Sequence, residues 1–261
     1  MTWQEVEQAA QRGAVLLWAF GVIEQHGPHL PAGTDVYVPS ARLQQLKRRL
    51  ADRNIEALIV PPYYWGVNQV SASFPASYTV RPEVMIELMA DVFASVRRDG
   101  FSRVFCFSGH GDPSHNLTIF RGVVEGANRT GMRIGFVTDR DLAARIGLAA
   151  DDPHLVLYKP AVRPVGGLDI HAGEVETSTM MCYCGSLVRD HFLTSLLSTD
   201  YGPADLAEWR QGGAHARRKT PLGYFGNPAA ARPETGKRST EALVEKLAMA
   251  IESRIAASAT S

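Results

Sequence analysis

Two carboxylates and two imidazoles lie close together between Phe20 and Ser40, directly after a run of apolar residues. Glu24 and His26 are two positions apart, so on an extended segment their side chains point to the same face. Asp35 follows the loop Leu30–Thr34, which allows its carboxylate to fold back toward them. Carboxylate and imidazole together suit zinc, manganese or iron, and one carboxylate can bridge two ions about 3.5–4 Å apart. The stretch therefore predicts a metal site.

Two later stretches carry the same kinds of residue. They are S-G-H-G-D-P-S-H-N, with His110, Asp112 and His115, and D-I-H-A-G-E-V-E-T-S, with Asp169, His171, Glu174 and Glu176. A lone histidine in a loop is usually a packing or surface residue, and we expect that of His29 and His115. Five of the eight histidines nevertheless fall in these three stretches beside carboxylates, which favours a shared site.

Asp112 has two alternative interpretations. Pro113 restricts it to an extended conformation, which would point Asp112 and His110 to the same side, as expected for a metal ligand. Alternatively, its carboxylate accepts a backbone N–H and shapes the turn. We favour the ligand, although the aspartate side chain is short.

The elements that must position these residues follow an alternating pattern. Short apolar runs predict strands at 14–20, 55–60, 104–107 and 134–137, and amphipathic segments predict helices at 38–53, 82–98, 117–130 and 240–256. This alternation indicates an α/β fold with a parallel sheet covered on both faces, which binds ligands beyond the carboxyl ends of its strands. We expect mainly loops over 139–167 and 198–233. No boundary is evident, so we expect one domain over residues 1–261.

Composition excludes several classes of protein. The 27 basic and 27 acidic residues balance, which argues against a nucleic-acid or anionic-membrane partner. No apolar run approaches the roughly 18 residues of a membrane helix, and no signal peptide is visible. The three cysteines are a poor disulfide framework. We therefore expect a cytoplasmic protein without nucleic-acid or membrane partners.

The three polar stretches resemble motifs of the creatininase family of amidohydrolases. E-Q-H-G-P-H-L-P-x-G-T-D resembles the first metal motif, S-G-H-G-D-P-S-H-N the glycine-histidine-glycine-glycine-asparagine segment, and H-A-G-E-V-E-T-S the third motif. W-G-V-N…F-P-A-S-Y (65–78) and G-Y-F-G-N-P (223–228) are weaker similarities. The resemblance covers about Ala14 to Leu247.

This resemblance implies a three-layer α/β/α fold with a mainly parallel central sheet. It also implies two divalent ions per chain, with zinc favoured and manganese or iron as alternatives, and a homohexamer. The ligand positions fall on Glu24, Asp35 and His110 for one ion. For the other ion they fall on His26 and on the bridging Asp35, and Asp112 or Glu176 completes the set.

The implied activity is hydrolysis of a small-molecule substrate, either a small amide, cyclic in particular, or a formamide. A hydroxide bridging the two ions attacks the carbonyl. His171 matches a histidine that acts on substrate, by stabilising the oxyanion or protonating the leaving nitrogen, and Glu176 or Asp112 carries the proton from the bridging water.

Two alternatives stay open. One is hydrolytic carbon–carbon ring opening of a cyclic polyol ketone, an inosose-like substrate, by the same site. The other is a metal-holding binding protein without turnover, against which His171 and Glu176 argue, because structural metal sites favour closed shells. Three departures from the family pattern, at Ala76, Asn116 and Arg232, are expected around the pocket and predict a substrate other than creatinine.

Overall fold

A parallel five-stranded sheet forms the centre of the protein, in a computed structural model that describes residues 1–159 and 168–257. The strands are β1 (Val15–Phe20), β2 (Ala57–Ile59), β3 (Arg103–Ser108), β4 (Arg133–Asp139) and β5 (Leu155–Tyr158). Their order is β2-β1-β3-β4-β5, and each neighbouring pair is parallel. Four strands coincide with predicted ones. The fifth, β5, lies in a segment expected to be loop, of which 160–167 falls outside the described residues.

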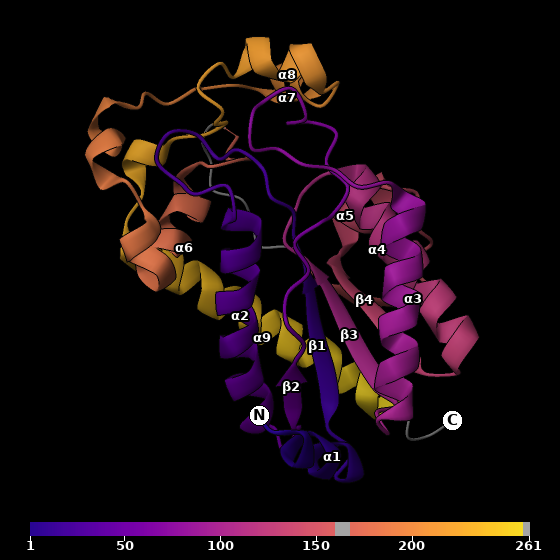
Figure 1. Cartoon of the computed structure of the whole chain (residues 1–261). Coiled ribbons are helices and arrows are strands. Elements are labelled where there is room, and N and C mark those ends of the chain that lie inside the picture. Colours follow the sequence, from indigo (N-terminus) through magenta and orange to yellow (C-terminus); the bar gives the residue numbers. More distant parts are fainter. Residues whose placement is uncertain (160–167, 258–261) are drawn as a thin grey trace.

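Helices cover both faces of this sheet and make the expected three-layer α/β/α fold (Figure 1). One face packs against α1, α3 and α4, and the other against α2 and α9. These helices are α1 (Trp3–Gln11), α2 (Thr34–Ala51), α3 (Pro82–Arg98), α4 (Pro113–Thr130) and α9 (Pro233–Ala257).

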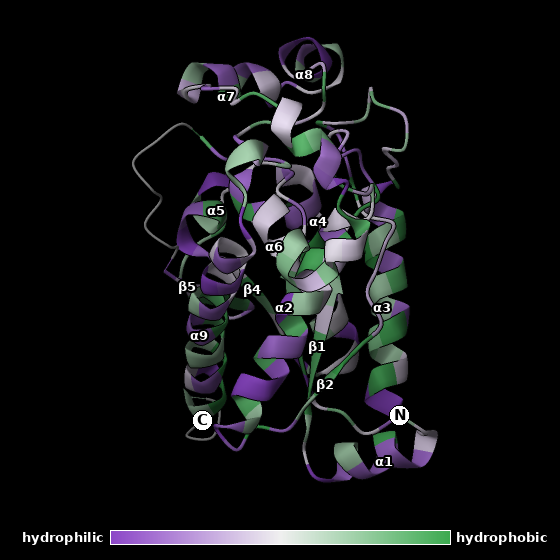
Figure 2. Cartoon of the chain, turned by 90° about the vertical axis from the view of Figure 1, so that its left-hand side faces the viewer, coloured by the Kyte–Doolittle hydropathy of each residue, from purple (hydrophilic) through white to green (hydrophobic). Residues whose placement is uncertain are grey.

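Burial on both faces explains why β1 is apolar throughout. Leu16, Trp18 and Phe20 face one core, and the alternate residues Leu17 and Ala19 face the other. Figure 2 shows the same division, with mainly green strands between helices that carry purple residues on their outer sides. The sheet is therefore a rigid support for the segments that leave its carboxyl edge.

A second group of helices lies toward the carboxyl ends of the strands, on the side of the molecule away from α1 (Figure 1). They are α5 (Arg140–Arg145), α6 (Glu174–Cys184), α7 (Pro203–Trp209) and α8 (Gly213–Lys219), with 3₁₀ turns at Gly185–Leu187, Asp190–Ser195 and Pro228–Ala230. Ser73 Oγ donates to Gly213 O at 2.7 Å, which ties α8 to the loop 61–81. The prediction of mainly loop over 198–233 was wrong for α7 and α8.

Three helices begin earlier than the sequence pattern predicted, and one of them is α9, which begins at Pro233 rather than at 240. Helix α4 begins at Pro113 rather than at 117, because Asp112 caps its first turn and the fixed φ of proline suits the first helical position. Helix α2 begins at Thr34 rather than at 38, so Asp35 lies in its first turn. Helices α2 and α4 consequently both start at the carboxyl edge of the sheet. Along the described ranges, no helix combines the length and the apolar character that crossing a membrane requires.

Candidate metal centre

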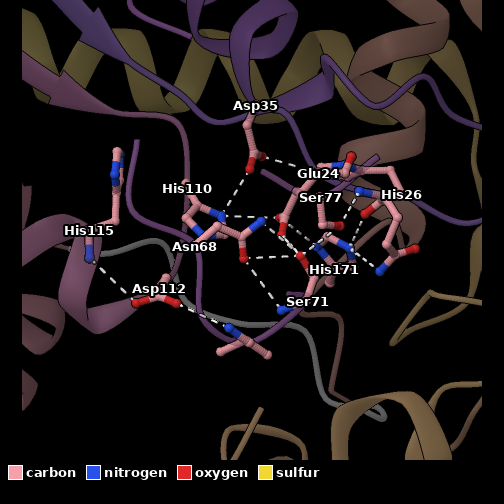
Figure 3. A network of polar contacts seen from close by, with 12 residues as sticks. Glu24, His26, Asp35, Asn68, Ser71, Ser77, His110, Asp112, His115 and His171 are labelled. Carbon is pink, nitrogen blue, oxygen red and sulfur yellow. Dashed lines mark hydrogen bonds and ion pairs between the residues drawn. The ribbon is translucent and has the colours of Figure 1, made fainter. Parts of the chain in front are cut away.

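Four side chains from three segments converge beyond the carboxyl ends of β1 and β3 (Figure 3). Glu24 and His26 follow β1, Asp35 belongs to α2, and His110 follows β3. His110 Nδ1 lies 3.1 Å from Glu24 Oε1 and 2.9 Å from Asp35 Oδ2, and His26 Nε2 lies 3.3 Å from Asp35 Oδ1. All four side chains are buried.

Two overlapping groups of ligand atoms share Asp35. One consists of Glu24, Asp35 and His110, and the other of His26, Asp35 and Glu176; within each group the ligand atoms lie within 4.8 Å of one another. The two oxygens of Asp35 face different histidines, Oδ2 toward His110 and Oδ1 toward His26. Asp35 is thus the residue shared by two groups of potential ligand atoms, with one oxygen directed to each histidine.

The environment of His26 fits a metal ion. Its Nδ1 lies 3.0 Å from Glu24 O, which can only accept, so Nδ1 carries the proton and Nε2 has a lone pair. Nε2 is buried and makes no hydrogen bond within the described part of the chain, although carboxylate oxygens of Asp35 and Glu176 lie 3.3 and 3.6 Å away. A lone pair facing two carboxylates is unfavourable unless a cation lies between them, and this donor set suits zinc or manganese.

Without a metal, protons would supply the missing positive charge. Burial alone would lower the pKa of His26, but the charges of Asp35 and Glu176 raise it to about 10. Burial would likewise lower the pKa of His110, and Glu24 and Asp35 raise it well above its ordinary value. The carboxylates of the cluster therefore favour a positive charge at both His26 and His110, which either a proton or a metal ion can supply.

A serine on the loop 61–81 holds Glu24 in place. Ser71 Oγ donates to Glu24 Oε2 at 2.5 Å, and Asn68 Nδ2 donates to Ser71 Oγ at 2.9 Å. Sequence reasoning missed both residues, although they lie in the segment 65–78 that showed weak family similarity. In the same segment Ala76 has φ 58°, a left-handed conformation that favours the glycine it replaces.

His171 lies against the cluster with one ring nitrogen fixed. Its Nε2 is 2.8 Å from Gln25 O, so this nitrogen carries the proton, and its Nδ1 is 3.5 Å from Glu24 Oε1. The ring centroid lies 4.3 Å from that of His26 and 5.7 Å from that of Trp209. His171 Nδ1 is thus the atom available at the cluster, and His171 also forms a third group of potential ligands with Glu24 and His26.

Glu176 is placed by the start of α6. Its Oε2 accepts from the backbone N–H of Ala172 at 2.8 Å, and its side chain is 26% exposed, more than the other carboxylates of the cluster. Asp169 accepts from the backbone N–H groups of Glu174 and Val175 at 2.7 and 2.9 Å. Asp169 therefore fixes the first turn of the helix that carries Glu176, and Glu174 is not part of the cluster.

The structure does not bring Asp112 into the cluster. Its Oδ1 accepts from the N–H of Ser114 at 2.7 Å, and its Oδ2 accepts from those of Gln69 and Val70 at 2.9 and 3.3 Å. Figure 3 shows this carboxylate directed away from Glu24 and His26. Asp112 has the extended backbone that Pro113 predicted, but it caps α4 and braces the loop 61–81, contrary to the ligand role we favoured.

His29 and His115 occupy structural positions. His29 Nε2 lies 2.9 Å from Thr177 Oγ1, and His115 Nδ1 accepts from Val67 N at 3.3 Å. Asn116 donates from Nδ2 to the carbonyl oxygens of His110 and Asp112, both at 2.8 Å, and so supports the turn. Arg232, expected near the pocket, is exposed and bonds to local carbonyl groups instead.

A cavity of about 210 Å³ opens onto this cluster. It is lined by His171, by apolar residues that include Val70, Ile170 and Trp209, and by all the candidate ligands except His26. Trp209 Nε1 donates to Thr220 Oγ1 at 3.0 Å, which fixes the indole. Drug-sized ligands usually occupy about 300–1,000 Å³, so this cavity suits a small substrate or one end of a larger one.

Comparison with known proteins identifies one matching family profile, described as creatinine amidohydrolase, over residues 1–251. The chain is 28% identical over 238 residues to a mycofactocin precursor peptide peptidase of Mycobacterium ulcerans, covering 88% of this chain and 81% of that protein. It is 27% identical over 270 residues to a creatinine amidohydrolase of Pseudomonas putida, and this match covers 96% of this chain and 94% of that protein. A shorter match is a 3-dehydro-scyllo-inosose hydrolase of Thermotoga maritima. It is 21% identical over 112 residues, which cover 42% of this chain and 34% of that protein.

Solved structures share the fold. A crystal structure of creatinine amidohydrolase superposes with a TM-score of 0.72 at 23% identity, covering 96% of this chain and 94% of that one. Other creatininase structures with TM-scores of 0.71 are described as containing manganese or as being of a Zn–Zn type. Those proteins therefore bind the metals that the donor set here would accept.

Proposed function

The chain belongs to the creatininase family of hydrolases, and from that membership we propose that it cleaves an amide bond with the help of two divalent metal ions. The ligands would be Glu24, Asp35 and His110 for one ion and His26, Asp35 and Glu176 for the other. The observation that carries this proposal is the sharing of Asp35 between two groups of ligand atoms, with one oxygen directed to each. Glu176, rather than Asp112, would complete the ligands of the second ion.

When bound, two such ions lower the pKa of water and polarise a carbonyl group. Zinc is our first expectation, with manganese or iron as alternatives. Ser71 keeps Glu24 oriented toward this site through its 2.5 Å hydrogen bond. Glu176, the more exposed carboxylate, would accept a proton from the attacking water.

His171 would act on the substrate. Because its Nε2–H is committed to Gln25 O, only Nδ1 can take up a proton and return it to the leaving nitrogen. Trp209 packs beside the imidazole and keeps water from that side of the ring. The chain thus supplies both a proton acceptor and a proton donor within one buried site.

The substrate class that fits best is a small amide, in particular a cyclic amide or a formamide, because the cavity measures about 210 Å³. A second candidate is the end of a short peptide, which the similarity to a peptide peptidase over 88% of this chain favours. The same cluster could also serve ring opening of an inosose-like ketone, but that similarity covers only 42% of the chain. We expect a homohexamer in the cytoplasm, in line with the family resemblance.

Chelation and reloading test this function. Turnover of lactams, formamides, short peptides or oxidised inositols should disappear after chelation and return with zinc or manganese. His171→Ala should keep both ions but lose about 10²–10⁴-fold in turnover. If His171→Ala loses metal together with activity, then His171 is a ligand. If chelation leaves turnover intact, the metal-dependent reaction is excluded.

A further inference from the structure

Two arginines lie at the outer part of the metal-site cavity and have no role in the function proposed so far. Arg145 is the last residue of α5, and Arg210 directly follows α7, so the two reach the cavity from different elements. Both are exposed, whereas Glu24 and Asp35 on the cavity floor are almost fully buried. The cavity therefore has carboxylates and imidazoles at its base and guanidinium groups at its rim.

The other carboxylates that line the cavity already accept hydrogen bonds from backbone N–H groups. Asp112 accepts N–H groups from the start of α4 and from the loop 61–81, and Asp169 accepts two from the start of α6. Within the described part of the chain, Arg145 forms no ion pair with either of them or with any other carboxylate. Arg145 therefore lines the cavity with a positive charge that no carboxylate of residues 1–159 or 168–257 neutralises.

Guanidinium groups bind carboxylates with paired hydrogen bonds, and they do so more strongly where water is partly excluded. The lining also includes the apolar side chains of Val70, Ile170 and Trp209. A ligand that fills this cavity would therefore meet a metal-binding cluster, apolar side chains and guanidinium groups. Its matching chemistry is an amide at one end, a short carbon segment, and an anionic group at the other end.

We infer that the substrate is an amide bearing a carboxylate a few bonds from the scissile carbonyl, and that Arg145 and Arg210 recognise this carboxylate. Acyl amino acids and peptides with a free carboxyl terminus belong to this class. The inference rests on the proposed function, since the metal site must hold the amide end. It assigns Arg145 and Arg210 to substrate specificity and leaves the bond-cleaving step to the cluster.

Matched hydroxamates test this inference without a known substrate, because a hydroxamate binds directly to protein-bound zinc. In one series, two to four methylene groups separate the hydroxamate from a terminal carboxylate; in the other, the terminal group is the uncharged primary amide. Calorimetry on zinc-loaded protein should show at least about five-fold tighter binding of the carboxylate form at one spacer length, and this preference should weaken as salt is added. Arg145→Met should reduce the preference, and Arg145→Met combined with Arg210→Met should abolish it.

The control variant is Arg140→Met, since Arg140 lies on the same helix, is exposed and does not line the cavity. It should keep the full preference, and all variants should bind the uncharged hydroxamates equally. Equal binding of both series to the unaltered protein, or a preference that survives in the double variant, would overturn the inference while leaving the metal site intact. Failure of every hydroxamate to bind would instead reject the metal site, and the inference with it.

Discussion

Asp35 is the residue on which a two-metal site depends. Its two oxygens face His110 and His26 at 2.9 and 3.3 Å, so neither group of ligands is complete without it. We expect Asp35→Ala to lose both ions, whereas Glu176→Gln should weaken only the one that His26 helps to hold. Elemental analysis of protein purified without chelator measures this. Retention of one tightly bound ion in Asp35→Ala would show that Asp35 does not bridge.

Asp112 is expected to contribute to stability rather than to metal binding. Asp112→Ala removes the cap of α4 and the acceptor for two N–H groups of the loop 61–81, so unfolding should become easier by about 1–2 kcal/mol. Asp112→Asn keeps one acceptor oxygen, so its free energy of unfolding should decrease less than that of Asp112→Ala. Urea titration gives the free energies, and metal content should stay unchanged in both variants. A variant with one weakly held ion, whose activity recovers at high metal concentration, would restore Asp112 as a ligand.

At the scale of residues, the sequence predicted most of the candidate metal ligands, but not all of the residues that contact and orient them. Glu24, His26, Asp35 and His110 could be selected because histidine and carboxylate recur at the ends of predicted strands. Asp112 shows the limit, because an aspartate before Pro113 suits a ligand and a helix cap equally well from sequence alone. Ser71 could not be chosen at all, because its role comes from a loop that folds back onto Glu24 from 47 positions away.

At the scale of elements, four of the five strands in the described part of the chain were predictable because their apolar runs are continuous, whereas the short edge strand β5 was not. Helices α5, α7 and α8 were not, because each is only six or seven residues long and shows little periodicity. They are held by tertiary contacts, as when Lys219 of α8 pairs with Asp205 of α7 at 2.9 Å. Arg145, Trp209 and Arg210 consequently escaped notice, since they belong to or adjoin these short helices.

Helix α6 depends on an aspartate outside it. Asp169 accepts the N–H groups of Glu174 and Val175, and Gly173 and Gly226 allow this close approach, since a Cβ on either would lie within 2.2 Å of Asp169 Oδ1. Asp169→Ala should therefore release the first turn and displace Glu176, lowering affinity for the second ion about 10–100-fold. Asp169→Asn should lose less affinity than Asp169→Ala, because the asparagine side-chain oxygen can still accept one of these two hydrogen bonds, whereas its NH2 group cannot accept the other.

Competition with a zinc-sensitive dye measures this affinity, and Asp141→Ala serves as the control, since Asp141 lies on α5 outside the cavity. Unchanged affinity for both ions in Asp169→Ala would mean that α6 keeps its position without this cap, and that Glu176 is held by Ala172 N alone.

For the whole molecule, a histidine buried where α4 meets the edge of the sheet makes stability depend on pH. Among the described residues, His115 joins α4 to the sheet edge, with Nε2 3.3 Å from Phe20 O and its ring against Gly66, where a Cβ would lie 2.3 Å from Cε1. This packing leaves no room for water around the imidazole. Burial lowers the pKa of His115 to about 4, so the folded protein holds it neutral where an unfolded chain would protonate it.

The contribution of His115 to stability should consequently be complete above the ordinary histidine pKa of about 6.5 and should fall as the pH decreases toward 4, where its loss amounts to about 3 kcal/mol. His115→Gln removes the titrating group, so the variant should be less stable at neutral pH but should lose less between about pH 6.5 and pH 4. His191→Gln, at an exposed position, should follow the unaltered protein throughout. Urea unfolding of chelated protein across this range measures the slope without interference from metal release. Parallel slopes for His115→Gln and the unaltered protein would place the acid sensitivity in other groups.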